Sequence, residues 1–156
     1  MDNPKKLKNY NLQANLGFTL LEVILVIATI AVLAAISVPV YSKLQVKNDL
    51  DVAANTVTQT LRRAQTLSQA VDGDDTWGVK LQSSDITLFK GTSYAARDID
   101  FDEVYSLSGN VTPSGITEAV FSKLLGTPNT TGTITLTSSN NDVQNITLNS
   151  KGVLDY

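Results

Sequence analysis

The sequence GFTLLEVILVIATIAVLAAISVPVYS, from Gly17 to Ser42, decides the fold of this chain. Its part from Val23 to Ser42 holds 20 residues without a charge. As an α-helix, this stretch is about 30 Å long, which matches the hydrocarbon thickness of a membrane. A secretory signal peptide has a shorter apolar region, so the sequence predicts a membrane helix that stays in the protein.

Helical periodicity continues beyond the apolar stretch. Apolar residues recur at steps of three and four and predict one buried stripe, in which Ser68 is the weak position. The stripe consists of Val46, Leu50, Ala53, Val57, Leu61, Ala64 and Val71. Asp72-Gly73 then supplies a stop signal. We therefore expect one helix from Phe18 to Val71, with a transmembrane half at residues 18–42 and an amphipathic half at residues 43–72.

The remainder, residues 73–156, has the pattern of a β-rich head. Apolar and polar residues alternate from residue 76 to 82, and a short connection at residues 83–85 predicts a hairpin with the next strand at 86–90. Further strands are expected at residues 103–107, 116–123, 133–137, 146–148 and 153–155. Gly109-Asn110 and Pro113-Ser114-Gly115 are interpreted as turns. The predicted fold class is α+β, with one long N-terminal helix packed on a mostly antiparallel sheet. A fragment from about Thr56 to Tyr156 is expected to fold alone.

Composition narrows the function classes. The chain has no histidine and no cysteine, which excludes disulfides, thiolate metal sites and His-dependent nucleophilic catalysis. No catalytic residue, cofactor or metal site stands out, so an enzyme is not expected. Two aspartate runs are candidate calcium loops, but neither has EF-hand spacing, and solvated turns are the alternative. These runs are Asp72, Asp74 and Asp75, and Asp98, Asp100 and Asp102.

Charge is divided unevenly along the chain. Residues 1–17 carry Lys5, Lys6 and Lys8 against Asp2, which leaves nine of the 12 basic and 14 of the 15 acidic residues for the rest. A basic segment before an apolar helix keeps the N-terminus on the cytoplasmic side. The acidic excess of the remainder argues against nucleic-acid binding.

Two residues distinguish the N-terminal segment from a plain signal anchor. Glu22 lies within the apolar stretch, where a carboxylate costs about 2–3 kcal/mol and is usually paired and functional. Gly17 lies between the polar leader and the apolar helix, where flexible backbone is open to a protease.

The segment resembles the class III signal of type IV pilins and type II secretion pseudopilins. The matching positions are Gly17, Phe18, Leu20, Leu21 and Glu22, followed by the apolar run and Pro39. The resemblance implies that residues 1–17 are a leader and that a prepilin peptidase cuts between Gly17 and Phe18. It also implies that the new amine of Phe18 is methylated and that Glu22 acts in filament assembly.

Pro39 lies inside the expected helix. A proline there removes the hydrogen bond to the carbonyl of Ala35 and crowds that carbonyl, which costs about 3 kcal/mol. Because helical periodicity resumes after Pro39, a kink is favoured over an end of the helix.

The sequence therefore predicts a structural filament subunit. The expected location is the inner membrane, crossed once with the N-terminus inside, followed by an extracytoplasmic filament. The resemblance implies as partners other pilin or pseudopilin subunits, the peptidase, an inner-membrane platform protein and an assembly ATPase, with membrane lipid around the helix before assembly. The head loosely resembles H-type minor pseudopilins, but major pilin, minor pilin and secretion pseudopilin all stay open. The alternative is a membrane-anchored extracytoplasmic binding module that does not polymerise.

Overall fold

The computed structural model describes residues 17–155, apart from the side chains of residues 37–39. The chain separates after Pro39 into two units, Met1–Pro39 and Val40–Tyr156. One helix, α1 (Leu20–Gln69, 50 residues), contributes to both units. The predicted long N-terminal helix is thus confirmed, although it begins and ends two residues inside the expected bounds.

The end of α1 is set by a left-handed turn. Val71 has φ 55°, a conformation that costs energy for a branched residue, and its N–H donates to the carbonyl of Ser68 at 3.1 Å. A short 3₁₀ turn, η1 (Asp72–Asp74), follows directly. The reversal therefore begins one residue before the predicted Asp72-Gly73 stop signal.

Eight strands in the described part of the chain form two antiparallel sheets of four strands each. The first sheet has the order β3-β2-β1-β5, built from β1 (Trp77–Leu81), β2 (Asp85–Lys90), β3 (Asp98–Ser106) and β5 (Glu118–Phe121). The second has the order β4-β6-β7-β8, built from β4 (Val111–Gly115), β6 (Gly132–Ser138), β7 (Val143–Leu148) and β8 (Leu154–Asp155). A 3₁₀ turn, η2 (Tyr94–Ala96), precedes β3.

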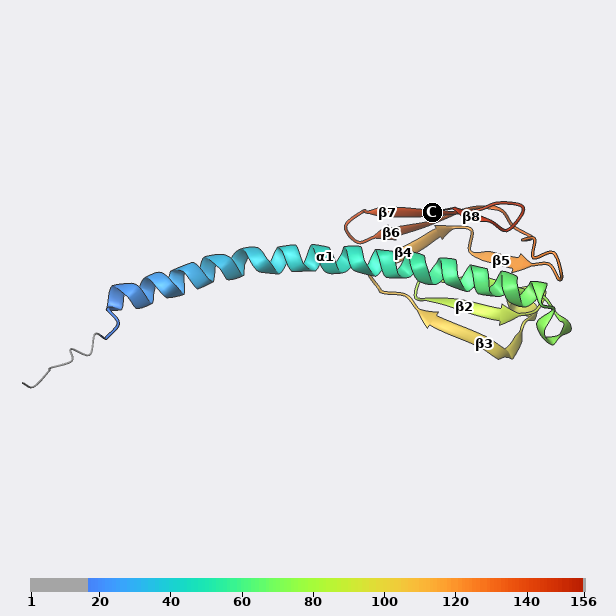
Figure 1. Ribbon diagram of the computed structural model, residues 1–156, viewed down its shortest axis with the longest axis horizontal. Coiled ribbons are helices and arrows are strands. Elements are labelled where there is room, and N and C mark those ends of the chain that lie inside the picture. The colour runs from blue at the N-terminus through green and yellow to red at the C-terminus, as the bar shows by residue number, and fades with distance from the viewer. Residues whose placement is uncertain (1–16, 156) are drawn as a thin grey trace, which may run out of the picture. The chain divides into compact units, whose positions relative to one another are not determined.

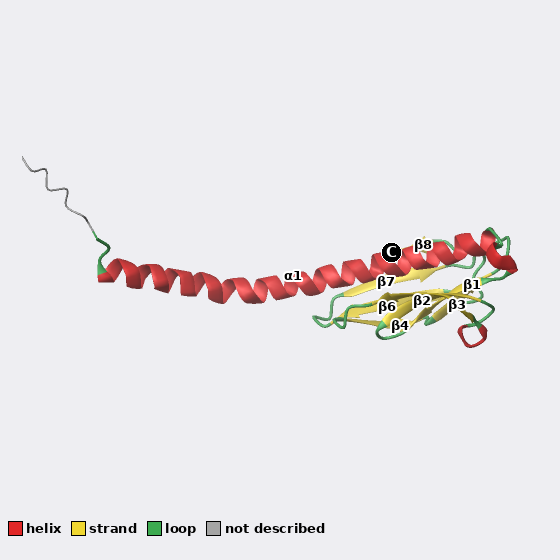
Figure 2. Cartoon of the chain, turned by 90° about the horizontal axis from the view of Figure 1, so that it is seen from below, coloured by secondary structure: helices red, strands yellow, loops and turns green. Residues whose placement is uncertain are grey.

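The two sheets share one helix as their cover. Figure 1 shows β6 and β7 on one side of the second half of α1 and β2 and β3 on the other. Figure 2, turned by 90°, shows the strands beneath that part of α1. The prediction of a helix laid on antiparallel strands is confirmed, but the strands form two sheets and not one.

Two segments that were expected to be turns or loops are strands. Residues 98–102 belong to β3, an edge strand that pairs with β2 alone. Pro113 and Gly115 belong to β4, opposite Leu136 and Ile134 of β6. A proline is tolerated in β4 because this strand also lies at the edge of its sheet, where one side needs no ladder hydrogen bonds.

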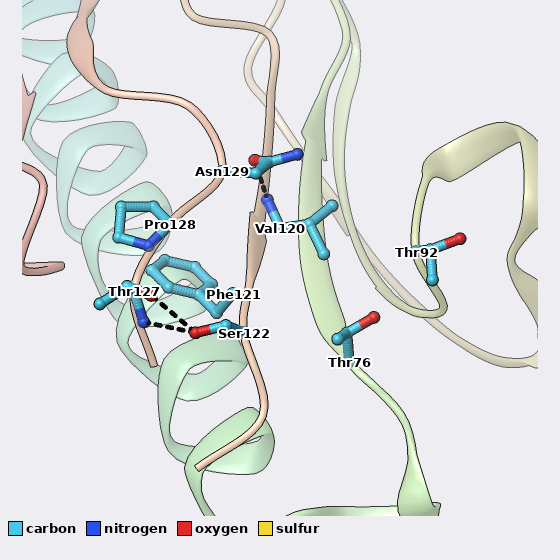
Figure 3. Close-up of a pocket in the computed structure, with 8 residues that line it drawn as sticks. All are labelled: Thr76, Thr92, Val120, Phe121, Ser122, Thr127, Pro128 and Asn129. Atoms are coloured by element: carbon cyan, nitrogen blue, oxygen red, sulfur yellow. Dashed lines mark hydrogen bonds between the residues drawn. The ribbon is translucent and has the colours of Figure 1, made fainter. Parts of the chain in front are cut away.

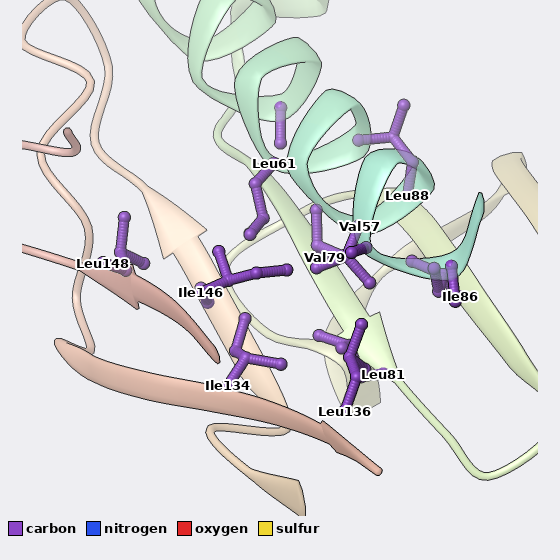
Figure 4. Packing of buried hydrophobic residues seen from close by; sticks show 14 of the residues in the cluster. Val57, Leu61, Val79, Leu81, Ile86, Leu88, Ile134, Leu136, Ile146 and Leu148 are labelled. Carbon is purple, nitrogen blue, oxygen red and sulfur yellow. The ribbon is translucent and has the colours of Figure 1, made fainter. Parts of the chain in front are cut away.

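The core lies between α1 and both sheets. Figure 4 shows Val57 and Leu61 of α1 pointing at side chains from β1, β2, β6 and β7. Leu61 is 0% exposed, as the predicted stripe requires. The buried residues of the stripe are Val46, Leu50, Ala53, Val57, Leu61 and Ala64. Full burial of one large aliphatic side chain stabilises the fold by about 1.5–3 kcal/mol.

Burial along α1 begins earlier than the expected fragment boundary. Val46, Leu50 and Ala53 are all buried against the head. A fragment that starts at Thr56 lacks these three side chains and leaves the core open at one end. The boundary at Thr56 stays a prediction, and these buried side chains, together with the unit Val40–Tyr156, favour an earlier start of the head.

Polar side chains attach α1 to loops and strands around the core. The Asp49 carboxylate accepts hydrogen bonds from Asn110 Nδ2 and Ser108 Oγ, both at 2.8 Å. These two hydrogen bonds lower the pKa of the Asp49 carboxyl, that from Asn110 most. A further tie lies two residues along α1, where Gln144 Nε2 donates to Asp51 Oδ1 at 2.6 Å.

Candidate processing and assembly site

Thr19 sets the start of α1. The backbone N–H of Glu22 donates to Thr19 Oγ1 at 3.2 Å, and the N–H of Val23 donates to the carbonyl of Thr19, also at 3.2 Å. Thr19-Leu20-Leu21-Glu22 has the sequence of a capping box, in which the first side chain satisfies an amide that the helix leaves open. Sequence reasoning missed Thr19, although this four-residue signal was present.

Gly17 and Phe18 precede the helix. Residues 17–19 have no regular secondary structure, so the peptide bond between Gly17 and Phe18 is outside the hydrogen-bonded helix. A Cβ placed on Gly17 meets no atom within 4 Å, and Phe18 is 83% exposed. A demand for glycine at residue 17 therefore does not come from packing in the described chain.

Glu22 is exposed in the first turn of α1, four residues after Phe18. Within residues 17–155, no cation forms a salt bridge with its carboxylate. Phe18, Glu22 and the next helical turn border a shallow hollow of about 250 Å³. The partial positive charge of a helix N-terminus favours a carboxylate by about 0.3–1 kcal/mol. A role in starting the helix thus competes with the predicted role in assembly.

The first half of α1 has an apolar surface on all sides. Every side chain from residue 18 to 36 is exposed, including Leu20, Leu33 and Ile36. The most apolar part has a mean hydropathy of 2.8, and by length and composition it is able to cross a membrane. Water disfavours such a surface, so lipid or other apolar groups around it would stabilise the helix.

Pro39 lies within α1, which continues from Leu20 to Gln69 without a break. Its side chain is outside the described residues. The kink at Pro39 therefore stays a prediction.

The two aspartate runs form other interactions in the structure. Asp74 pairs with Lys123 at 3.1 Å, and Asp102 accepts a 2.7 Å hydrogen bond from Arg97 Nε. Asp75 Oδ1 accepts the N–H of Thr76 at 2.7 Å. In the described part of the chain, no three acidic side chains converge on a common point that would hold a cation. The second run lies on strand β3 and not in a loop.

A separate hollow of about 270 Å³ lies between β5 and the loop that follows it. Figure 3 shows its lining, which consists of Thr76, Thr92, Val120, Phe121, Ser122, Thr127, Pro128 and Asn129. Ser122 Oγ and Thr127 Oγ1 are 2.7 Å apart, and Asn129 Oδ1 accepts the N–H of Val120 at 2.9 Å. These polar groups already bind one another, so the hollow offers few free donors to a ligand. Sequence reasoning missed it because its residues come from distant segments.

Comparison with known proteins adds no assignment. No protein-family model, curated protein or solved structure matches this chain.

Proposed function

We propose that this chain is a pilin or pseudopilin subunit of a type IV pilus-like filament. It is made with a leader, clipped after Gly17 by a prepilin peptidase, methylated at Phe18 and polymerised through residues 18–42. One observation carries the proposal: an uncharged helix segment, exposed at every residue from 23 to 36, begins directly behind Gly17-Phe18-Thr19-Leu20-Leu21-Glu22.

The first half of α1 presents apolar side chains that the head does not cover. The head completes its core with the second half of the helix, so it has no use for side chains such as Leu25 or Ile30. In a membrane, lipid covers these side chains. Outside the membrane, each large side chain left in water costs about 1.5–3 kcal/mol, and a bundle of identical helices removes that cost. A filament core built from many copies therefore fits this surface.

The proposal includes a location and partners. The chain crosses the inner membrane once with its N-terminus inside and then moves into an extracytoplasmic filament. Its partners are other subunits of the filament, the peptidase, a platform membrane protein and an assembly ATPase. The chain itself has a structural role and performs no catalysis.

Processing provides the first test. The mature chain is expected to span residues 18–156, with one added methyl group on the amine of Phe18, and intact-mass measurement of the membrane fraction reports both. Gly17→Val is expected to accumulate uncut precursor. A Cβ at Gly17 meets nothing in the described chain, so this defect reflects peptidase recognition. Gly109→Val is the matched control, because Gly109 is equally open but lies in the head. A mature chain that still begins at Met1 would contradict the proposal.

A membrane-anchored binding module is the second candidate. The hollow of Figure 3 favours it, since Val120, Phe121 and Pro128 offer apolar contacts to a small ligand, while most of the polar groups around them already bind one another. The two candidates differ in polymerisation. Electron microscopy of cells in which the chain is fully clipped distinguishes the two candidates, because a binding module forms no filaments.

A further inference from the structure

We propose that the head carries a tip-to-base interface for a second copy of this chain. The tip consists of residues 123–126, called the tip loop, together with η1 (Asp72–Asp74). The base groove is lined by Val40, Lys43, Leu44, Lys47, Asn140 and Asp142. This inference rests on the proposed filament function and goes beyond it by naming the head surfaces that meet.

The tip loop presents two adjacent large apolar side chains to solvent. Leu124 is 74% exposed and Leu125 is 73% exposed. Single exposed leucines are common on protein surfaces, but two adjacent ones at a loop tip give a partner a continuous apolar surface to cover.

The tip loop is held in place. Gln65 Nε2 donates to the carbonyl of Gly126 at 3.0 Å, and Gln69 Nε2 donates to the carbonyl of Leu125 at 3.3 Å. Leu124 has φ 65°, a left-handed conformation that is strained for a leucine and concentrates at functional sites. A fixed loop binds a partner at a lower entropic cost than a mobile loop does.

Negative charge lies beside these leucines. Asp72 and Asp74 are exposed on η1, and the 3.1 Å contact between Lys123 Nζ and Asp74 Oδ1 places η1 next to the tip loop. The tip therefore combines an apolar pair with the carboxylates of Asp72 and Asp74 and the ammonium group of Lys123, and the Lys90 side chain lies beside Gly73 of η1.

The base groove has the complementary composition. It has a volume of about 490 Å³ and a floor formed by Val40 and Leu44, which are both exposed. Lys43 and Lys47 flank it from α1, and Asp142 flanks it from the turn between β6 and β7.

Tip and base lie at opposite ends of the head. In Figure 1, the β6–β7 turn lies at one end of the strands, and the chain that leaves α1 lies at the other. Along α1, residues 44 and 69 are about 38 Å apart at 1.5 Å per residue. One copy therefore cannot bring its own tip into its own groove.

The two surfaces match group by group. The leucine pair faces Val40 and Leu44, the carboxylates of η1 face Lys43 and Lys47, and Lys123 faces Asp142. A contact between different surfaces of identical copies continues from copy to copy, and it forms an open filament unless its rotation closes a ring.

This contact differs from the expected pairing at the N-terminus. A Glu22 carboxylate that binds the Phe18 amine of a neighbour shifts the two copies by about 6 Å, the rise of four helical residues. A tip-to-base contact shifts them by about 38 Å on the same scale. The two contacts therefore join different pairs of copies, and each can fail without the other.

Disulfide cross-linking tests the contact directly, because the natural chain has no cysteine. The full chain with Leu44→Cys and Leu124→Cys is assembled in cells, oxidised and run on a non-reducing gel. We expect a ladder of linked multimers, at least tenfold above the level in either single variant. A mixture of copies that carry only Leu44→Cys or only Leu124→Cys is expected to stop at dimers.

The control pair is Leu44→Cys with Val104→Cys. Val104 is also an exposed apolar residue of the head but lies on β3, away from the tip loop. An equal ladder from the control pair means random collision and overturns the proposal. Filaments without a ladder from the Leu44 and Leu124 pair overturn the tip-to-base contact but leave the filament function standing. A clipped natural chain that forms no filaments overturns the filament function itself.

Charge exchange provides a second, independent measurement. In the Leu44→Cys and Leu124→Cys background, Lys43→Glu with Lys47→Glu is expected to reduce the ladder at least fivefold. Adding Asp72→Lys and Asp74→Lys is expected to restore the ladder, because the charges on both surfaces are then reversed and attract each other again. A ladder that stays low after this exchange contradicts the charge pairing that the proposal requires.

Discussion

At the scale of single residues, Ser68 shows how a weak position in a pattern can be essential in the fold. Among the apolar residues of the stripe it is the exception, yet it is fully buried. Its hydroxyl oxygen accepts the N–H of Trp77 at 2.8 Å, and its hydroxyl group is 3.3 Å from the carbonyl oxygen of Trp77. The serine therefore joins the last turn of α1 to the first residue of β1.

Replacement of Ser68 is expected to expose this dependence. Ser68→Ala removes the acceptor for the buried N–H of Trp77 and should lower the free energy of unfolding by about 1–3 kcal/mol. Thr66→Ala is the control, because Thr66 is exposed and its hydroxyl bonds only the Arg62 carbonyl within the same helix. The control should change stability by less than about 0.5 kcal/mol. Urea unfolding followed by Trp77 fluorescence measures both, and equal effects would contradict the assigned role.

At the scale of elements, α1 belongs to two environments along its length. Its first half is exposed on all sides, whereas its second half supplies one wall of the core through residues such as Leu50, Val57 and Leu61. The helix beyond Val40 is thus part of the head. A boundary at Thr56 would divide the buried stripe in the middle.

Fragment length is expected to show this directly. Residues 40–156 should unfold cooperatively, whereas residues 56–156 should lose most of their stability. The shorter fragment lacks Val46 and Leu50, whose burial contributes about 1.5–3 kcal/mol each. The total free energy of unfolding of a small domain is only about 5–15 kcal/mol. Near-ultraviolet circular dichroism against temperature measures both, and equal melting temperatures would show that the first helical turns are dispensable.

At the scale of the whole molecule, Glu22 has two possible roles in assembly. Its carboxylate can bind a neighbouring copy, or the residue can stabilise the first turn of α1. Its backbone N–H is capped by Thr19, so the residue has a local role as well as the proposed intermolecular one. The two roles predict different outcomes for substitutions at residues 19 and 22.

We expect Glu22→Ala and Glu22→Gln to leave insertion and clipping intact and to reduce filament yield strongly. Both variants remove the carboxylate that would bind the Phe18 amine of a neighbouring copy. The amine then stays unpaired in an apolar surrounding, which is energetically costly. Thr19→Ala is the matched control, since it removes the helix cap, at a cost of about 1 kcal/mol of helix stability, and keeps the Glu22 carboxylate. Filament yield by electron microscopy is compared with the membrane level of clipped chain. A Thr19→Ala defect as large as that of Glu22→Ala would assign Glu22 to helix initiation.

The sequence by itself determined the features that depend on near neighbours in the chain. The uncharged run from Val23 to Ser42, the buried stripe with Leu61 and the β1–β2 hairpin all follow from residues a few positions apart. The candidate residues Gly17, Phe18 and Glu22 belong to this group, because their signal is contiguous.

Only the tertiary structure decided how distant segments meet. The division into two sheets depends on pairings such as that of β4 with β6, which turns Pro113 and Gly115 from presumed turn residues into an edge strand. The burial of Ser68, the aspartates of β3 and the separation of tip loop from base groove have the same origin. Local propensity acts over a few residues, whereas strand order and surface matching depend on which distant groups the shared core brings together.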